Sequence, residues 1–373
     1  MSRLRAIQAL GQSVWLDDIG RALVEDGGLR RLVERDGVSG VTSNPAIFEQ
    51  AIRASDRYDA AIARAARDDV GPEEAFRRMA FRDVRDGADV LAAVHRATGG
   101  RDGLVSFELP PALADDAHGT VAAARRVVAQ IGRPNLLVKV PGTEAGVAAL
   151  EELTTAGVSV NVTLLFSVAR YVQAAEAYLR GLERRVAAGA PVHGVASVAS
   201  FFVSRVDAAV DPTLERSGRP DLVGRTAVAN AHVAYEAFAG IFRGHRWAAL
   251  AARGARVQRP LWASTSAKNP AFPDVKYVDA LIGPHTVTTL PPATLAAARE
   301  RATPARTLGA GADEARRVLA EVAAQGVDLV DLCERRLLRE GLVAFAASHD
   351  RLLESIGRRM RALAGRAPAQ APG

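Results

Sequence analysis

The chain has 373 residues, of which 49% are hydrophobic, 24% charged and 5% aromatic, and its formal net charge is +6. This composition is typical of a globular protein and excludes a fibrous or wholly disordered chain. The single cysteine, Cys333, excludes an intrachain disulfide and a zinc site built from cysteines. No run of about 18 apolar residues and no apolar signal-peptide core is found, so we expect a cytoplasmic protein with no membrane segment.

Eight short segments have the continuous hydrophobicity of strands buried on both faces. They span residues 13–17, 37–42, 103–109, 135–140, 158–166, 194–203, 259–264 and 285–290. Segments with helical spacing lie between them, among them 46–66, 72–97, 119–131, 144–154, 167–187 and 224–250. The alternation of strands and helices over eight candidate strands predicts an α/β fold, a TIM (β/α)8 barrel with inserted helices and a helical C-terminal extension.

The same pattern divides the chain. We expect residues 1–305 to form the barrel, with helical insertions near 46–100 and 206–256, where the connections between strands are long. Residues 306–362 carry only helical patterns and are predicted to pack on the barrel as C-terminal helices. Residues 363–373 are rich in proline, glycine and alanine and are expected to form a disordered tail.

The positive charge comes almost entirely from arginine, because only Lys139, Lys268 and Lys276 are lysines among 48 basic residues. The arginines are spread along Ala-rich segments and interleaved with acids, with no basic tail and no aromatic–basic RNA-binding motif. We therefore predict a surface of mixed charge and no nucleic-acid partner, while a preference for small anionic molecules remains possible. Lys276 is interpreted as a surface residue.

Three ionisable side chains lie in or at the end of apolar strands. Lys139 lies within NLLVKV, Glu108 within VSFEL, and Asp17 follows VWL. A buried charge is costly unless it is paired or neutralised, and a desolvated neutral amine attacks carbonyl groups to form Schiff bases. Because barrel strands end at one common mouth, we expect the three side chains to converge there. The alternatives are a lysine that reaches solvent or pairs with a carboxylate, and acids that are solvated or cap helices.

Polar residues extend this rim on the second and fifth strands. Thr42, Ser43 and Asn44 close the second strand, where Ser43 or Asn44 could instead cap the following helix. Asn161 and Thr163 lie two residues apart and therefore share one face of their strand. A buried asparagine needs hydrogen-bonding partners, and sugar hydroxyls would be suitable ones.

The sixth and seventh strands end in residues suited to an anion. Ser200, Phe202 and Arg205 lie at the end of the sixth strand, and Ser264 and Lys268 follow the seventh. Arg205 offers a fork of donors and Lys268 a point charge, which together suit a phosphate group. Many barrels bind phosphate at their late strands.

These segments, taken in order, resemble the transaldolase family, in the longer form with extra helices found in many bacteria. The matching segments are VWLDDIGR (14–21), GVTSNPAIFEQAI (40–52), VSFEL (105–109), NLLVKVPGTEAG (135–146), VNVTLLFS (160–167), SFFVSRVD (200–207) and LWASTSAKNPAFPDVKYVDALIG (261–283). They span most of residues 13–290, so the resemblance does not depend on one short motif.

The resemblance implies a role for each candidate. Lys139 matches the Schiff-base lysine, Glu108 the catalytic glutamate and Asp17 the aspartate acid/base. The dihydroxyacetone part of the substrate, or the catalytic water, is assigned to Thr42, Asn44, Asn161, Thr163 and Ser200, with Phe202 as a further substrate-binding residue. Arg205 and Ser264 match phosphate-contacting positions. One departure is that shorter transaldolases have an arginine soon after the Ala-Ser pair, where this chain has TSAKN (265–269), so Lys268 is assigned to the phosphate.

The resemblance further implies an enzyme of the non-oxidative pentose phosphate pathway. It would transfer a dihydroxyacetone unit from sedoheptulose 7-phosphate to glyceraldehyde 3-phosphate through a lysine Schiff base. Sugar phosphates are the expected partners, neither a cofactor nor a metal is expected, and the chain would be a monomer or a homodimer. Three alternatives remain: an aldolase of the same Schiff-base family, a catalytically silent sugar-phosphate-binding barrel, and an arginine-driven nucleic-acid binder.

Overall fold

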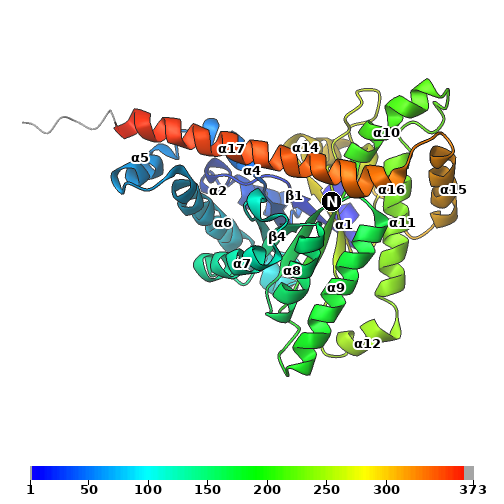
Figure 1. Cartoon of the computed structure of the whole chain (residues 1–373), viewed down its shortest axis with the longest axis horizontal. Coiled ribbons are helices and arrows are strands. Elements are labelled where there is room, and N and C mark those ends of the chain that lie inside the picture. The colour runs from blue at the N-terminus through cyan, green and yellow to red at the C-terminus, as the bar shows by residue number, and fades with distance from the viewer. Residues whose placement is uncertain (1, 365–373) are drawn as a thin grey trace, which may run out of the picture.

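The computed structural model describes residues 2–364 of the chain and contains a closed barrel of eight parallel strands in chain order (Figure 1). The strands are β1 (Gln12–Leu16), β2 (Gly40–Thr42), β3 (Leu104–Glu108), β4 (Leu136–Pro141), β5 (Val160–Leu165), β6 (Ser197–Phe202), β7 (Arg259–Ala263) and β8 (Thr286–Leu290). Each lies within or close to a predicted strand, and the predicted TIM barrel is confirmed. No helix of the described part is long and apolar enough to cross a membrane.

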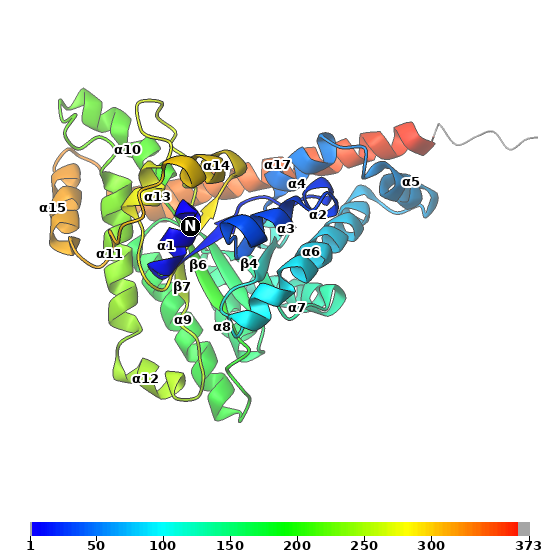
Figure 2. The same ribbon diagram turned by 180° about the vertical axis from the view of Figure 1, so that it is seen from behind.

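Helices surround this barrel (Figure 2). They are α1 (Arg3–Ala9), α2 (Arg21–Glu25), α3 (Gly28–Arg31), α4 (Pro45–Arg53), α5 (Asp59–Arg67), α6 (Pro72–Ala97), α7 (Ala117–Ile131), α8 (Glu144–Thr155), α9 (Val168–Ala187), α10 (Ser204–Arg216), α11 (Thr226–Ile241), α12 (His245–Ala251), α13 (Lys276–Ala280), α14 (Pro292–Arg301), α15 (Ala312–Ala323), α16 (Leu329–Asp331) and α17 (Leu337–Ala364). A 3₁₀ turn, η2 (Pro111–Leu113), and two π-helical segments, η1 (Leu32–Asp36) and η3 (Leu332–Arg336), complete the elements.

The segment with helical spacing over 46–66 forms two helices, α4 and α5, separated by residues 54–58. Tyr58 is fully buried at this break. Its hydroxyl donates to Asp83 Oδ2 at 2.8 Å and accepts from the backbone N–H of Arg21 at 2.9 Å. The break between the two helices therefore places Tyr58 for these tertiary hydrogen bonds, which helical spacing in the sequence does not predict. The helix predicted over 224–250 is likewise divided, into α11 and α12, with Gly244 at the N-cap of α12.

The C-terminal helices cover two different parts of the molecule. α15 packs against α11, whereas α17 runs along α4, α5 and α6 and reaches the end of β5 (Figure 1). α17 includes the first two residues of the expected tail, and residues 365–373 of that tail lie outside the described residues. The division of the chain into barrel, C-terminal helices and tail stays a prediction.

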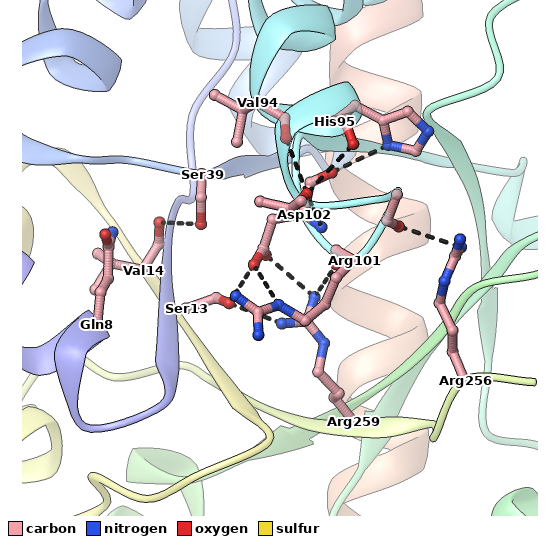
Figure 3. Close-up of polar contacts among 12 residues, drawn as sticks. Gln8, Ser13, Val14, Ser39, Val94, His95, Arg101, Asp102, Arg256 and Arg259 are labelled. Atoms are coloured by element: carbon pink, nitrogen blue, oxygen red, sulfur yellow. Dashed lines mark hydrogen bonds and ion pairs between the residues drawn. The ribbon is translucent and has the colours of Figure 1, made fainter. Parts of the chain in front are cut away.

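A buried ion-pair network closes the base of the barrel, where the strands begin (Figure 3). Asp102, just before β3, accepts from Ser13 Oγ at 2.7 Å and from Trp15 Nε1 at 3.1 Å. Arg259 of β7 donates to Asp102 Oδ1 at 3.2 Å and to Ser13 Oγ at 2.7 Å. Burial by itself would raise the pKa of Asp102, but Arg259 and the two hydrogen bonds outweigh it and hold that pKa below its usual value. The network therefore joins β1, β3 and β7 with its charges satisfied.

We predict that Arg259→Met destabilises the protein by about 3–5 kcal/mol, because it leaves the buried carboxylate of Asp102 without its cation. The control is Arg301→Met, since Arg301 pairs with Asp274 on the surface, where about half of each side chain is exposed. Loss of such an exposed pair should cost less than about 1 kcal/mol. Urea unfolding followed by circular dichroism measures both changes, and equal losses in the two variants would contradict the prediction.

Candidate active site

Lys139 and Glu108 lie side by side at the C-terminal ends of β4 and β3. The two residues are register partners across these strands, so their side chains leave the sheet on the same face. Lys139 Nζ donates to Glu108 Oε2 at 3.4 Å and to the backbone carbonyl of Ser43 at 3.1 Å. Only 6% of the Lys139 side chain and 8% of the Glu108 side chain is exposed. The arrangement is a buried ion pair at the mouth of the barrel.

A second carboxyl group, Asp17, acts on the same cation. Burial raises the pKa of Asp17, although the charge of Lys139 and a hydrogen bond from Thr42 oppose the shift. That bond runs from Thr42 Oγ1 to Asp17 Oδ1 and measures 2.6 Å. Burial likewise raises the pKa of Glu108, to about 7, against the attraction of Lys139 and with a further contribution from Asp17. Two buried acids around one lysine thus keep an exchangeable proton in the site near neutral pH.

A cavity of about 180 Å³ opens at this mouth. Ten of the residues singled out in the sequence line it: Asp17, Thr42, Asn44, Lys139, Thr163, Ser200, Phe202, Arg205, Ser264 and Lys268. Glu108 borders it through the contact with Lys139, and Asn161 lies below it. The structure therefore brings all twelve sequence-derived candidates to one end of the barrel.

Asn161 is held by protein partners and not left open to the cavity. Its Nδ2 donates to Ser106 Oγ at 3.0 Å, and its Oδ1 accepts from Ser200 Oγ at 2.6 Å. By contrast, Thr163 Oγ1 is buried and has no hydrogen-bond partner within residues 2–364. Of the two residues on this face of β5, Thr163 is the one whose polar atom is available to a water or a substrate hydroxyl.

Asn44 combines two roles that the sequence offered as alternatives. Its Oδ1 accepts from the backbone N–H of Ile47 at 3.1 Å and caps α4. Its side chain also lines the cavity, so the amide nitrogen stays available as a donor. Ser43 is not the cap, because its hydroxyl donates to the carbonyl of Ser106 at 2.8 Å.

The side of the cavity toward β6 and β7 is positively charged. Arg205, in the first turn of α10, and Lys268, after β7, make no hydrogen bond or ion pair with any described residue. Burial lowers the pKa of Arg205, although Glu340 opposes it, and burial together with the charge of Arg205 lowers the pKa of Lys268. Two cations that repel each other beside a helix N-terminus favour an anionic group between them.

Backbone strain occurs near this positively charged side of the cavity. Ser264 has a φ of 54°, and Leu164, next to Thr163, has a φ of 58°. Non-glycine residues in this region cost about 1–3 kcal/mol each and concentrate at functional sites. The register between β5 and β6 shifts over the same turn, between Val162 and Leu165. The strain thus falls at Ser264, which lines the cavity, and at Leu164, which follows the cavity residue Thr163.

Thr289 and Phe345 are among the cavity residues that escaped the sequence analysis. The hydroxyl groups of Thr289, in β8, and Thr42 are joined by a 2.7 Å hydrogen bond. In the sequence, Thr289 could be noticed only as a threonine at the end of a buried strand. Phe345 comes from α17, and its ring centroid lies 5.8 Å from Lys139 Nζ. No spacing rule connects a late helix to a particular strand end, so tertiary structure was needed to find it.

Lys276 is not the surface residue that the sequence suggested. Its Nζ lies 3.3 Å from the ring centroid of Phe272 and 3.9 Å from Asp207 Oδ2, and only 18% of its side chain is exposed. It anchors the segment that follows Lys268 to α10. Within the described residues, no group of three or more His, Cys, Asp or Glu side chains could hold a metal ion.

Comparisons with known proteins agree with this geometry. The family described as Transaldolase/Fructose-6-phosphate aldolase matches residues 14–356. A protein of Neisseria gonorrhoeae named Transaldolase is 48% identical over 354 residues, which cover 95% of this chain and 99% of that protein. A Transaldolase of Thiobacillus denitrificans is 47% identical over 360 residues (96% and 100%), and Transaldolase 1 of Streptomyces coelicolor is 46% identical over 357 residues (95% and 93%). The chain belongs to the transaldolase/fructose-6-phosphate aldolase family.

Proposed function

We propose that the protein is a transaldolase. It transfers a dihydroxyacetone unit from sedoheptulose 7-phosphate to glyceraldehyde 3-phosphate and releases erythrose 4-phosphate and fructose 6-phosphate. Relatives named Transaldolase match nearly the whole chain at 46–48% identity. The observation that carries the assignment is the buried Lys139 amine, 3.4 Å from Glu108 and lining a cavity together with Asp17.

The first step forms the Schiff base. The proton on Lys139 passes to the Glu108 carboxylate across their contact, which leaves a neutral amine to attack the C2 ketone. The carbinolamine hydroxyl then takes this proton from Glu108 and departs as water, and an iminium ion remains on Lys139. Thr163 Oγ1, which has no protein partner among the described residues, would hold that water.

The second step breaks the carbon chain. The Asp17 carboxylate takes the proton of the C4 hydroxyl, the C3–C4 bond breaks, and its electron pair flows into the iminium to give an enamine. Erythrose 4-phosphate leaves with its new aldehyde. The hydrogen bond from Thr42 and the positive charge on Lys139 both favour the ionised Asp17 that this step needs.

The acceptor half runs these steps in reverse. The enamine carbon attacks the aldehyde of glyceraldehyde 3-phosphate, and Asp17 returns its proton to the new alkoxide. Water then hydrolyses the iminium with Glu108 as proton carrier and frees fructose 6-phosphate. Phe202 and Phe345 line the cavity around the amine, and we assign them to excluding water from the waiting enamine.

Arg205, Lys268 and Ser264 bind the substrate phosphate in this proposal, supported by the two unpaired cations at one side of the cavity. Asn44, Ser200 and Asn161 fix the hydroxyls of the three retained carbons, Asn161 through its bond to Ser200. We further propose that the enzyme works in the cytoplasm, as a monomer or homodimer. The low cysteine content supports a reducing compartment.

An aldolase that releases free dihydroxyacetone would use the same Schiff base and the same two acids. The family description names this activity beside transaldolase. The relatives compared above are named Transaldolase, and the two cations suit phosphorylated donors and acceptors alike. We therefore keep the aldolase reaction as the second candidate.

We predict that borohydride reduction in the presence of fructose 6-phosphate attaches the three-carbon unit to Lys139, as read by peptide mass spectrometry. Lys139→Met should lose both the adduct and all measurable turnover, because it removes the amine that lies 3.4 Å from Glu108. The control Lys268→Met keeps Lys139 and should still form the adduct. An adduct on another residue, or turnover in Lys139→Met, would remove the central assignment.

We predict that kcat/KM rises with pH through about 7, the pKa of Glu108. Below that pH Glu108 is protonated and cannot accept the proton of Lys139, whereas above it the pair holds a single proton that can be transferred. Glu108→Gln should lower turnover strongly and abolish this limb of the profile. If the Glu108→Gln enzyme showed the same rise of kcat/KM with pH, the ionisation would belong to another group.

We predict that Arg205→Ala and Lys268→Met each raise KM for glyceraldehyde 3-phosphate about 10- to 100-fold, the effect of one charged hydrogen bond. Their kcat/KM for unphosphorylated glyceraldehyde should stay within about 2-fold of wild type, because that acceptor has no phosphate to lose. Arg216→Ala, at the exposed far end of α10, is the control and should change neither value. Equal losses of kcat/KM with the two acceptors would show that the phosphate binds at other residues.

A further inference from the structure

A second cavity lies behind the active site and shares a wall with it. Its volume is about 390 Å³, larger than the catalytic cavity and within the range of about 300–1,000 Å³ typical of small-molecule sites. Asn44 lines both cavities, and Ser43 and Glu108 line the second one next to Lys139. Lys139 bonds to two of these residues from the catalytic side, at the carbonyl of Ser43 and the carboxyl of Glu108. A molecule in the second cavity would therefore touch groups that position the reactive amine.

One side of this cavity is built from aromatic rings. Phe48 meets Phe76 at a centroid distance of 5.4 Å and Phe107 at 6.3 Å, and Phe81 meets Phe107 at 5.3 Å, all edge to face. All four rings line the cavity. Such a surface favours a flat apolar molecule that can stack on the rings or contact their edges.

A positively charged side chain, Arg126, lies at the rim of the cavity. Arg126 of α7 lines the cavity and forms no hydrogen bond or ion pair with the residues that the structure describes. Arg77, the other guanidinium on the rim, is held by Glu74 and Gln130. Glu73 also lines the cavity. Burial lowers the pKa of His349, and the charge of Glu73 opposes that shift. A ligand with one anionic group directed at Arg126 therefore complements the cavity.

α17 covers both cavities. His349 lies over the second one, with its ring 5.9 Å from that of Phe76, edge to face. Phe345, one helical turn earlier, lies over Lys139 in the first. The two side chains are four residues apart and so share one face of the helix, which Figure 1 shows running across α4 and α6. A shift of α17 that accommodates a ligand beneath His349 would also move Phe345.

We propose that this cavity is a second binding site, for small aromatic molecules that carry one carboxylate or sulfonate group, and that its occupation slows turnover. The ring system lies on the phenylalanine side and the anion pairs with Arg126. Slowing follows because the ligand presses on the wall of Ser43, Asn44 and Glu108 and on the helix above it. The effect on turnover rests on the proposed function, whereas binding does not.

The test uses 8-anilinonaphthalene-1-sulfonate, whose fluorescence increases in an apolar site. Wild-type protein should bind the probe at one saturable site. Arg126→Gln should weaken binding about 5-fold, the upper value for one partly exposed ion pair, and Arg125→Gln, its exposed neighbour outside the cavity, is the matched control and should leave binding unchanged. Ala123→Trp, which fills the cavity from α7, should abolish saturable binding, while Ala129→Trp on the exposed side of that helix should retain it.

Competition and kinetics complete the experiment. Saturating fructose 6-phosphate should not displace the probe, and the probe should lower kcat in wild type and in Arg125→Gln but not in Ala123→Trp. Unchanged probe binding in Ala123→Trp and Arg126→Gln would overturn the proposal, as would displacement by fructose 6-phosphate, which would place the probe in the catalytic cavity. Binding without any change in kcat would overturn the coupling alone. Absence of transaldolase turnover with intact probe binding would instead contradict the proposed function.

Discussion

The contact between Lys139 and Glu108 is the constraint on which the site depends. A lysine in an apolar barrel strand must find a partner within reach, and the closed sheet supplies one because the register places Glu108 beside it on the neighbouring strand. Pairing with Lys139 does not keep the pKa of the nearby acids at its usual value. Asp17 adds a second carboxyl to the same dry space, and burial moves the pKa of both acids upward, that of Glu108 to about 7. The site thus satisfies its buried cation and still holds a proton that chemistry can move.

Polar residues have different surroundings at the base and at the mouth of the barrel. At the base, Asp102 receives two neutral donors and a guanidinium, and its pKa falls. At the mouth, Thr163 keeps a buried hydroxyl without a partner among residues 2–364, and Ser264 lies in a strained conformation. Unsatisfied polar atoms and strain cost stability, whereas the charges of the Asp102–Arg259 pair at the base are satisfied.

The sequence predicted the barrel and the members of its site because both follow from local rules. Buried parallel strands are continuous apolar runs, and polar residues at their ends must meet at the mouth. What the sequence missed depended on contacts between distant segments. The break between α4 and α5 serves the buried hydroxyl of Tyr58, and Lys276 turns inward because Phe272 and Asp207 receive it. Phe345 reaches Lys139 from a helix that begins far beyond the last strand. No periodicity encodes such placements.

Contacts toward both ends of α17 hold this helix over the mouth of the barrel. Far from the cavity, Arg359 binds Asp59 Oδ1 at 2.6 Å and two backbone carbonyls of the α4–α5 segment, which anchors the C-terminal half of the helix. Near Arg205, a Cβ at Gly341 would come within 2.8 Å of a Leu164 side-chain carbon, so glycine lets the helix lie close to β5 without a shift of that side chain. Phe345 and His349 lie between these two fixed points. Because both side chains belong to one helix, a single element lines the catalytic and the second cavity.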